Sequence, residues 1–453
     1  MRRLTSDPGG LAERVFARLD ARLSRNVERP VALALSGGGD SIALLRLATE
    51  WAGARGRRLL ALSVDHGLNP DSARWNGFAR QAAMTAGADW RGLRWEGDKP
   101  RTGLTAAARS ARHRLIAGAA RAAGARVVLF AHTADDIAEA DLMRREGATL
   151  GRVREWSPSP VWPEGRGLML LRPLLDEGRE PLRDGLRAQG ADWIEDPANA
   201  DPRYGRSRAR QALAAGGAAP QPVSGPRGVS GAQGLRTVGA ASVEASRDIP
   251  ARTLAAALVC VGGGATPPRG GRLETLVRRL RADEDFTATL CGARITAAGE
   301  TATLVREAGE MARKGAAPLR LTPGVEAVWD GRFAFTAAEA GWSVAAGRGR
   351  LSQLSDTDRA ALAPLTPQAR AAWPVLVRDK GGDGGEGAVL AGSGVERRGL
   401  VAERLRLALD ETTHEDDLIS APRWRNAMEP PIFPDRHIQT GGPNGAADDR
   451  GPQ

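Results

Sequence analysis

Residues 30–41 read PVALALSGGGDS, and this stretch decides the fold of the first half of the chain. Its apolar part, residues 31–35, has the length and composition of a buried strand, and an apolar stripe at helical spacing begins at Ile42. A glycine-rich turn between a strand and a helix directs backbone N–H groups into one small space, where the helix N-terminus adds partial positive charge. The stretch therefore predicts an anion site of the kind that holds phosphate.

Two common phosphate loops can be excluded at this turn. A Walker A loop ends in Gly-Lys-Ser/Thr, whereas the lysines of this chain are Lys99, Lys314 and Lys380. The dinucleotide fingerprint G-x-G-x-x-G fails because residue 42 is isoleucine. The remaining pattern, SGGGDS at 36–41, resembles the pyrophosphate loop (PP-loop) of N-type ATP pyrophosphatases, which cleave ATP between the α- and β-phosphates. A turn that only connects strand and helix is the alternative interpretation.

Two further predicted strands also end in polar residues. Residues 59–64 are followed by the motif DHG, and residues 127–130 are followed by AHTADD. Helical patterns at 71–87 and 104–123 alternate with these strands, which predicts an α/β fold with a doubly wound parallel sheet. Ligands of such sheets bind where the C-terminal ends of the strands meet the loops. We therefore expect SGGGDS, DHG and HTADD to border one site.

Six motifs occur in an order that resembles one enzyme family. After SGGGDS come SVDHGLNPDS at 63–72, TGLTAAARSARHRL at 102–115, AHTADDIAEADLMR at 131–144, RPLL at 172–175 and WIEDPANADPRYGRSRAR at 193–210. Together they resemble the tRNA(Ile)-lysidine synthetases over the first half of the chain. The EDPxN segment and the arginine cluster after it point to this family rather than to other PP-loop enzymes. The later matches CGARI, VRE and WDGRF are much weaker.

The resemblance implies a two-step reaction on an isoleucine tRNA with a CAU anticodon. ATP adenylates the C2 oxygen of the wobble cytidine and releases pyrophosphate. The side-chain amine of free lysine then attacks C2 and expels AMP, which leaves lysidine. The modified base pairs with A instead of G, so codon specificity changes from AUG to AUA. ATP, Mg²⁺, free lysine and this tRNA are therefore the implied substrates and partners.

The resemblance also implies which residues bind ATP and the metal. Asp40 and Asp136 are the candidates for holding Mg²⁺. The expected ATP-binding residues are those of the glycine-rich turn: Ser36, Gly37, Gly38, Gly39, Asp40 and Ser41.

The catalytic candidates are Asp135, Asp136, His132, Arg109 and Arg112. The two adjacent carboxylates can bind Mg²⁺, or one can orient or deprotonate the lysine amine, whose reference pKa is about 10.4. A helix cap is the alternative, chiefly for Asp135. His132 is a candidate for contacting phosphate or base, with a hydrogen-bonded core residue as its alternative. The two arginines lie on one helix face and are candidates for stabilising the adenylate, unless that face is only solvated.

Charge favours a nucleic-acid partner. The formal net charge is +10, the sequence pI is about 10.8, and arginine supplies almost all the positive charge. Arg206, Arg208 and Arg210, which follow the EDPxN segment, are the candidates for binding tRNA. The abundance of Ala, Gly, Pro and Arg has a second explanation, a GC-rich genome.

Composition predicts four parts in the chain. Residues 1–210 are expected to form the catalytic domain, and residues 211–249, rich in Gly, Ala, Ser and Pro, a flexible linker. Smaller α+β domains, in one or two subdomains, are expected at 250–425, followed by a disordered tail at 426–453. The resemblance implies that the domains at 250–425 bind tRNA.

Within the C-terminal part, helices are predicted at 250–262 and 271–283, a β-hairpin at 286–307 and further strands between 319 and 342.

A cytoplasmic location is expected. Cys260 and Cys291 lack metal or redox spacing, which suits a reducing compartment. Charges throughout residues 1–29 argue against a secretory signal, and no apolar run is long enough to span a membrane. The sequence does not fix the oligomeric state, and a homodimer stays open.

The segment after the paired aspartates departs from the family pattern. Ile137 replaces the usual glutamine, Glu139-Ala140 replaces Glu-Thr, and residues 145–148 replace a leucine and a glycine-serine-glycine turn. These changes concern the segment expected to face lysine and the anticodon.

Two other functions are weighed against the lysidine synthetase. A thiolase or an amidotransferase-type PP-loop enzyme would need a cysteine near the loop or the N-terminus, and none precedes Cys260. A non-catalytic tRNA-binding protein would not need both SGGGDS and the aspartate pair.

Overall fold

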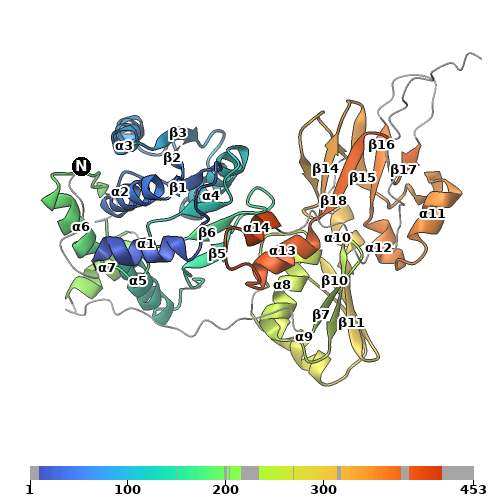
Figure 1. The fold of residues 1–453 in the computed structure, drawn as a ribbon. Coiled ribbons are helices and arrows are strands. Elements are labelled where there is room, and N and C mark those ends of the chain that lie inside the picture. Colours follow the sequence, from blue (N-terminus) through green and yellow to red (C-terminus); the bar gives the residue numbers. More distant parts are fainter. Residues whose placement is uncertain are drawn as a thin grey trace, which may run out of the picture.

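The structure, a computed structural model, describes residues 10–420 except 149, 198–200, 204, 216–233, 269, 314–317 and 379–386. Figure 1 shows two parts side by side. The N-terminal domain (described residues of 10–215) layers helices on a sheet, and the C-terminal region (described residues of 234–420) is rich in strands. Helices α13 (Val401–Ala408) and α14 (Asp417–Ser420), at the end of the described chain, lie between the two parts (Figure 1).

The sheet of the N-terminal domain has the order β3-β2-β1-β4-β6-β5. Neighbouring strands pair in parallel, apart from the antiparallel pair at the β5 edge. Leu33 pairs with Ala61 of β2 and with Leu129 of β4, and all three side chains are buried. The strands are β1 (Val31–Ala34), β2 (Leu59–Asp65), β3 (Asp89–Arg94), β4 (Val127–Leu129), β5 (Trp156–Pro158) and β6 (Met169–Leu171).

Apolar side chains cover both faces of this sheet. One core joins helices α1, α2, α3 and α6 to the sheet, with Trp51 of α2 fully buried in it. A second core places Ile116 of α4 against Ala32, Leu62 and Val128. The predicted doubly wound α/β fold is therefore confirmed. The helices are α1 (Leu11–Asp20), α2 (Gly39–Ala54), α3 (Ser72–Ala86), α4 (Leu104–Ala122), α5 (Ala134–Arg145), α6 (Arg179–Ala188) and α7 (Gly205–Ala215).

The C-terminal region begins with an antiparallel sheet of order β7-β8-β11-β10-β9. Helix α8 packs on this sheet, and α9 packs on α8. These elements are β7 (Leu235–Val238), β8 (Ser242–Ser246), α8 (Ala251–Val261), α9 (Gly271–Arg281), β9 (Phe286–Leu290), β10 (Ala293–Ala298) and β11 (Thr301–Arg306).

Two smaller sheets complete the region, in the orders β12-β15-β16-β17 and β13-β14-β18. One continuous apolar core joins them to the first sheet. Their strands are β12 (Leu319–Arg320), β13 (Ala327–Trp329), β14 (Phe333–Ala337), β15 (Trp342–Ala346), β16 (Pro374–Arg378), β17 (Ala388–Val389) and β18 (Val395–Gly399). Between them lie α10 (Ala308–Arg313), the 3₁₀ turn η2 (Leu351–Gln353), α11 (Asp356–Leu362) and α12 (Pro367–Ala371).

The predicted boundaries of the flexible linker, residues 211 and 249, are both wrong. Residues 211–215 continue helix α7, and residues 235–246 form β7 and β8. Composition hid these strands because their buried positions include small residues such as Ala245, which is 1% exposed. The tail predicted at 426–453 lies outside the described residues.

The elements predicted further along are largely confirmed. Helices α8 and α9 lie within the predicted ranges, and β10 and β11 form the predicted hairpin. Residues 286–307 contain a third strand as well, because Cys291 and Gly292 have positive φ and turn the chain between β9 and β10. No helix in the described part of the chain is long and apolar enough to cross a membrane.

Candidate active site

The candidate site lies where the order of strands in the N-terminal sheet reverses. The chain runs outward from β1 through β2 to β3 and then places β4 on the other side of β1. Ligands of doubly wound sheets bind at such switch points, outside the C-terminal ends of the strands. The SGGGDS turn follows β1 and the HTADD motif follows β4, so both motifs border this point.

The turn after β1 is shaped by its own serines. Ser41 Oγ donates to the carbonyl oxygen of Gly38 at 2.8 Å and lies 3.1 Å from Ser36 Oγ. Helix α2 begins at Gly39, and no side chain caps its N-terminus. The first N–H groups of a helix have no acceptor within the helix and carry partial positive charge. The turn can therefore bind an anion through its backbone.

Gly37 is the position of the turn that requires glycine. Its φ is 86°, in the left-handed region. A Cβ at this position would lie 2.5 Å from Cδ1 of Ile194. Ile194 belongs to the WIEDP segment, and its N–H donates to the carbonyl oxygen of Gly37 at 2.9 Å. Two motifs that are far apart in the sequence therefore pack directly on each other at the turn.

Asp40, in the first turn of α2, can take up a cation. Its Oδ2 accepts from Arg179 Nε at 3.2 Å, whereas Oδ1 is buried without a hydrogen-bond partner among the described residues. Burial raises the pKa of Asp40 above its usual value, and Arg179 opposes this shift. The described residues contain no cluster of three or more metal-binding side chains. Asp40 nevertheless fits Mg²⁺, because proteins commonly bind this ion through one or two carboxylates together with phosphate oxygens.

The two aspartates of the HTADD motif have different partners from those expected. The alternative role for Asp135, a cap of the helix predicted at 136–145, is wrong, because α5 begins at residue 134 with Thr133 as its N-cap, and Asp136 completes the capping box. Asp136 Oδ2 accepts from the Thr133 N–H at 2.9 Å and from its hydroxyl at 3.3 Å. Asp135 Oδ2 accepts from the N–H of Arg179 at 2.8 Å and thereby holds the start of α6.

Arg179 connects the acidic side chains of the site. Besides Asp40, its guanidinium binds Glu139 at 3.1 Å and lies 4.0 Å from Asp136 Oδ1. Burial would lower the pKa of Arg179, but these carboxylates raise it above its usual value. The sequence analysis missed this residue. The available signal was its charge, since an arginine in the first turn of a helix opposes the helix dipole unless acidic partners hold it.

Glu139 is the second residue that the sequence analysis missed. Its side chain is 1% exposed, and Oε1 accepts from Arg179 and, at 2.8 Å, from Arg210 Nε. The arginine cluster is drawn to α5 in the same way at Arg206, whose Nη1 lies 3.1 Å from Asp136 Oδ1. Arg208 instead donates to the carbonyl oxygen of Pro202 at 2.8 Å. Two of the three expected tRNA-binding arginines thus pair with acids of the site.

A group of cations without acceptors faces this acidic network. Arg112 is half-buried, and its Nε is buried without a hydrogen-bond partner among the described residues. Burial and the neighbouring charges of Arg109 and Arg206 lower the pKa of Arg112 to about 10. Burial also lowers the pKa of Arg109, and Asp136 partly offsets this effect. Two neighbouring arginines without acceptors among the described residues favour an anionic ligand.

His132 lies beside these arginines as a neutral ring. Its Nδ1 accepts from Arg172 Nε at 3.2 Å, so its ring proton is on Nε2. The ring stacks on Phe130 at a centroid distance of 6.0 Å, and Phe130 stacks on His113. Burial lowers the pKa of His132 to about 3, although the Asp136 carboxylate opposes this shift. At neutral pH, His132 can therefore donate a hydrogen bond from Nε2.

The switch point thus has an anion-binding turn, an acidic network and a cationic side. The acidic network consists of Asp40, Asp135, Asp136 and Glu139, joined through Arg179. Such an arrangement can hold a nucleoside triphosphate at the turn and a positively charged or amine group at the carboxylates. Fold and turn together define the class of the N-terminal domain, which is a PP-loop domain. In agreement, residues 11–215 match a family model described as a PP-loop domain.

Relatives identify the family. The chain is 46% identical over 402 residues to the tRNA(Ile)-lysidine synthase of Caulobacter vibrioides, covering 88% of this chain and 97% of that protein. It is 37% identical over 351 residues to the tRNA(Ile)-lysidine synthase of Hyphomonas neptunium, covering 72% and 94%. The chain therefore belongs to the tRNA(Ile)-lysidine synthase family, which confirms the resemblance seen in the motifs. The similarity also extends well beyond the first half of the chain.

Proposed function

We propose that the protein ligates lysine to C2 of the wobble cytidine in the CAU anticodon of tRNA(Ile), with ATP cleaved to AMP and pyrophosphate. One observation carries the proposal: the SGGGDS turn at the N-terminus of α2 is joined, through Arg179, to the carboxylates of α5. This arrangement occurs in a chain that belongs to the family named for this product. It brings a triphosphate site and an amine site together at one edge of the sheet.

In the first step, the C2 oxygen of cytidine attacks the α-phosphorus of ATP, and the bond to pyrophosphate breaks. Ser36, Gly37, Gly38, Gly39 and Ser41 form the cradle for the phosphates in this proposal. Negative charge develops on the phosphate oxygens, and aimed donors stabilise it most effectively in a buried site. We assign this role to Arg109 and Arg112, which lack other acceptors in the described part of the chain.

Mg²⁺ is part of this proposal. When bound, it would neutralise charge on the phosphates of ATP. Asp40 is the residue that would hold the ion, through the buried Oδ1 that has no other described partner. Asp136, the second candidate ligand, already uses Oδ2 to cap α5 and Oδ1 to bind Arg206. It is therefore the weaker choice for the metal.

In the second step, the lysine nitrogen attacks C2, the bond from C2 to the AMP oxygen breaks, and the amine loses its protons. Asp136 and Glu139 supply negative charge for binding the ammonium group and for taking up a proton. Asp135 acts through Arg179, since it fixes the start of the helix that carries this arginine. The Nε2–H of His132 is available for the base or a phosphate oxygen.

The tRNA itself would bind to both parts of the chain. We propose that Arg208 contacts the RNA backbone, and that Arg206 and Arg210 do so from the rim of the site, where their side chains are 40% and 35% exposed. The C-terminal region would bind the tRNA away from its anticodon. The cytoplasm is the compartment in which such a substrate is modified. All the residues named here belong to one chain, so the proposed site is the same in a monomer and in a homodimer.

The cysteines argue against a thiolase. No cysteine precedes Cys260, and Cys260 is 1% exposed in helix α8 of the C-terminal region. The described structure therefore offers no thiol beside the SGGGDS turn.

The deciding experiment is mass analysis of a CAU-anticodon tRNA incubated with the protein, ATP and lysine. We expect the tRNA to gain the mass of lysine less one water, with one AMP and one pyrophosphate formed per tRNA. Asp40→Ala and omission of lysine serve as controls, and neither should yield this product. A tRNA of unchanged mass, or one that exchanges oxygen for sulfur, would contradict the proposal.

A further inference from the structure

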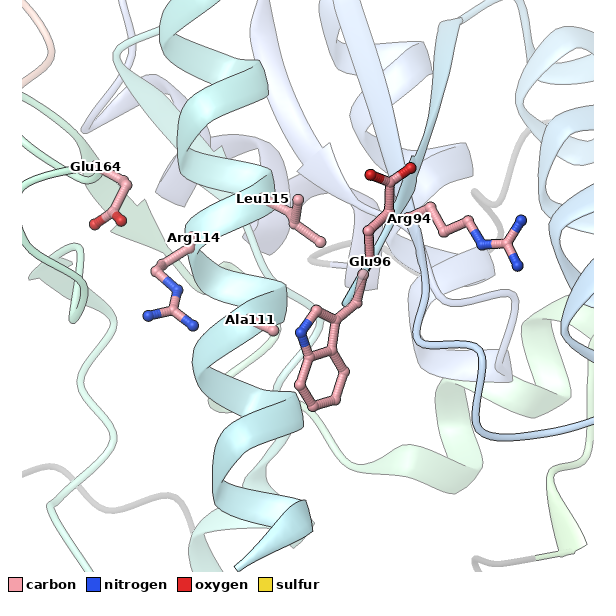
Figure 2. A pocket seen from close by; sticks show the side chains of 7 residues that line it. Arg94, Glu96, Ala111, Arg114, Leu115 and Glu164 are labelled. Carbon is pink, nitrogen blue, oxygen red and sulfur yellow. The ribbon is translucent and has the colours of Figure 1, made fainter. Parts of the chain in front are cut away.

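An open groove of about 470 Å³ lies against helix α4, outside the network of acids and arginines described above. Its volume is within the range of roughly 300–1,000 Å³ that is usual for small-ligand sites. In Figure 2, Arg114 and Glu164 lie on one side of α4, and Arg94 and Glu96 lie on the other. The groove is lined by Arg94, Trp95, Glu96, Ala111, Arg114, Leu115 and Glu164.

Trp95 is the aromatic side chain of the groove, and its surroundings fix its position. The backbone N–H of Trp95 donates to the carbonyl oxygen of Asp65 at 2.8 Å, at the C-terminal end of β2. His66 approaches the indole edge-on at 6.1 Å between centroids. The Lys99 ammonium lies 5.4 Å from the ring and donates to the carbonyl oxygens of Trp95 and Gly97 at 3.3 Å each. The indole is therefore a partly exposed ring held in place before any ligand binds.

The charged residues of the groove lack protein partners. Arg94 and Arg114 are exposed and have no acceptor in the part of the chain that the structure describes. Oε2 of Glu164 is buried and has no hydrogen-bond donor among the described residues.

The groove shares a sheet edge and a helix with the candidate active site. Trp95 follows β3 at the same edge of the sheet where the SGGGDS turn follows β1. Helix α4 contributes Ala111 and Arg114 to the groove and Arg112 to the cationic side of the site. A flexible chain that places one nucleotide in the site could therefore place a neighbouring nucleotide in the groove.

We infer that the groove binds a nucleotide that flanks the reacting cytidine in the anticodon loop, an inference that rests on the proposed function. The base stacks on Trp95. Arg94, Arg114 and Lys99 neutralise the phosphates on either side. Proteins recognise single-stranded RNA loops in this way, by stacking splayed bases on aromatic rings and binding their hydrogen-bonding edges.

The test uses the full-length protein and two anticodon stem-loop RNAs. One carries 2-aminopurine on the 5′ side of the reacting cytidine and the other on its 3′ side. Stacking quenches 2-aminopurine, so one of the two RNAs should lose fluorescence on binding. Trp95→Ala should abolish this quenching and weaken binding about 5- to 100-fold, since one base stacked on an aromatic ring contributes about 1–3 kcal/mol. Trp95→Phe should restore both.

Charge is tested with a matched pair of variants. Arg94→Ala should weaken RNA binding and reduce its salt dependence, because Arg94 lines the groove. Arg91→Ala removes the same charge from an exposed position of β3 outside the groove and should change neither.

Two results would overturn the inference while leaving the proposed function intact. In the first, wild-type protein forms lysidine but neither fluorescent RNA responds to Trp95→Ala. In the second, free lysine displaces quenching in competition with the RNA, which would make the groove an amino-acid site. Failure of the proposed function is a separate observation, since the wild-type protein would then form no lysidine at all.

Discussion

The two carboxylate oxygens of Asp136 bind different partners and carry out different tasks. Oδ2 accepts from the N–H and hydroxyl of Thr133 and caps α5, whereas Oδ1 faces Arg206. Burial would raise the pKa of Asp136, but the Thr133 N–H and the guanidinium groups of Arg179 and Arg206 hold it below its usual value. The carboxylate is therefore ionised at neutral pH, and its charge and its capping bond can be removed separately.

Asp136→Asn should separate these tasks. Asparagine keeps an oxygen that accepts from the Thr133 N–H, so α5 stays capped, but the negative charge beside Arg206 is lost. Single-turnover lysidine formation should fall by roughly 10²–10⁴-fold while ATP binding persists. Asp136→Ala should in addition lower the free energy of unfolding by about 1 kcal/mol, because the cap is lost. A near-normal rate in Asp136→Asn would exclude a role of the charge in the chemical step.

His132 should act as a hydrogen-bond donor and not as a general base. With its pKa lowered to about 3, the ring is neutral throughout pH 5–8, so the rate should show no inflection from His132 in this range. His132→Gln offers an amide N–H near the position of Nε2 and should keep more activity than His132→Ala. The measurement is the pH–rate profile of both variants beside the wild type. An inflection near pH 6.5 that disappears in both variants would contradict this assignment.

At the scale of elements, the site depends on contacts between turns that are distant in sequence. The SGGGDS turn after β1 packs against the WIEDP segment through Gly37 and Ile194. Helix α5 binds the first residue of α6 through Asp135, and it binds α7 through Glu139 and Arg210. The N-termini of α2 and α6 are therefore held by contacts with segments that are distant in the sequence.

Gly37→Ala should disrupt the turn. A Cβ would lie 2.5 Å from Ile194 Cδ1, and a left-handed φ costs a non-glycine residue about 1–2 kcal/mol. We expect lower stability and weaker ATP binding, measured by chemical denaturation and by nucleotide titration. The control is Gly53→Ala within α2, where no atom lies within 4 Å of the new Cβ. It should stabilise the protein by up to about 1 kcal/mol. Equal ATP affinity in both variants would contradict the role of Gly37.

The sequence was sufficient for β1, β2 and β4 because a buried parallel strand is a continuous apolar run. It was insufficient for β3, whose residues DWRGLR lie at the sheet edge and are mostly exposed. The motifs likewise predicted where the site lies, but they did not predict the ion pairs between its side chains. Arg179 is 139 residues from Asp40 and 40 from Glu139, and only the packing of α6 on α2 and the hydrogen bond from the Arg179 N–H to Asp135 of α5 bring these charges together. No local pattern encodes such pairs.

At the scale of the whole molecule, two ion-pair networks join the C-terminal region to the N-terminal domain. Glu326 binds Arg121 and Arg166 of the N-terminal domain together with Arg398 of β18. Near the end of the described chain, Glu415 binds Arg29 and Arg57 and accepts from the N–H of Ser24. The relative position of the two parts therefore depends on charge as well as on apolar packing.

Glu326 should make the free energy of unfolding depend on pH in acid solution. Burial opposes its ionisation, but hydrogen bonds from Arg398 and Arg166 lower its pKa to about 2, below the usual 4.5. The contribution of ionised Glu326 to the free energy of unfolding is thus present above about pH 4.5 and is lost as the pH falls towards 2. Glu326→Gln should cost about 2 kcal/mol at pH 7, and its difference from wild type in urea denaturation should shrink below about pH 4.5. Glu339→Gln, from an exposed pair with Arg378, is the control and should cost little. A difference independent of pH would contradict this account.

Glu415 and Arg57 should form the stronger of the two connections. Both side chains are 0% exposed, and their two hydrogen bonds measure 2.8 and 3.1 Å. Glu415→Gln would leave the Arg57 guanidinium buried without its main counter-charge, which typically costs about 3–5 kcal/mol. In the double variant Arg57→Met/Glu415→Gln the buried guanidinium of Arg57 is removed as well, and the partly exposed Arg29 keeps Asp416 as a partner, so denaturation should show part of that loss recovered.

The same pair of variants addresses how the substrate is held. If the C-terminal region binds tRNA and Glu415 keeps it in position, Glu415→Gln should raise KM for full-length tRNA more than KM for an anticodon stem-loop. The stem-loop lacks the parts of the tRNA that we propose to bind the C-terminal region, so it serves as an internal control for damage to the active site. Equal increases in KM for both RNAs would mean that the contact stabilises the N-terminal domain without aligning the two parts on the tRNA.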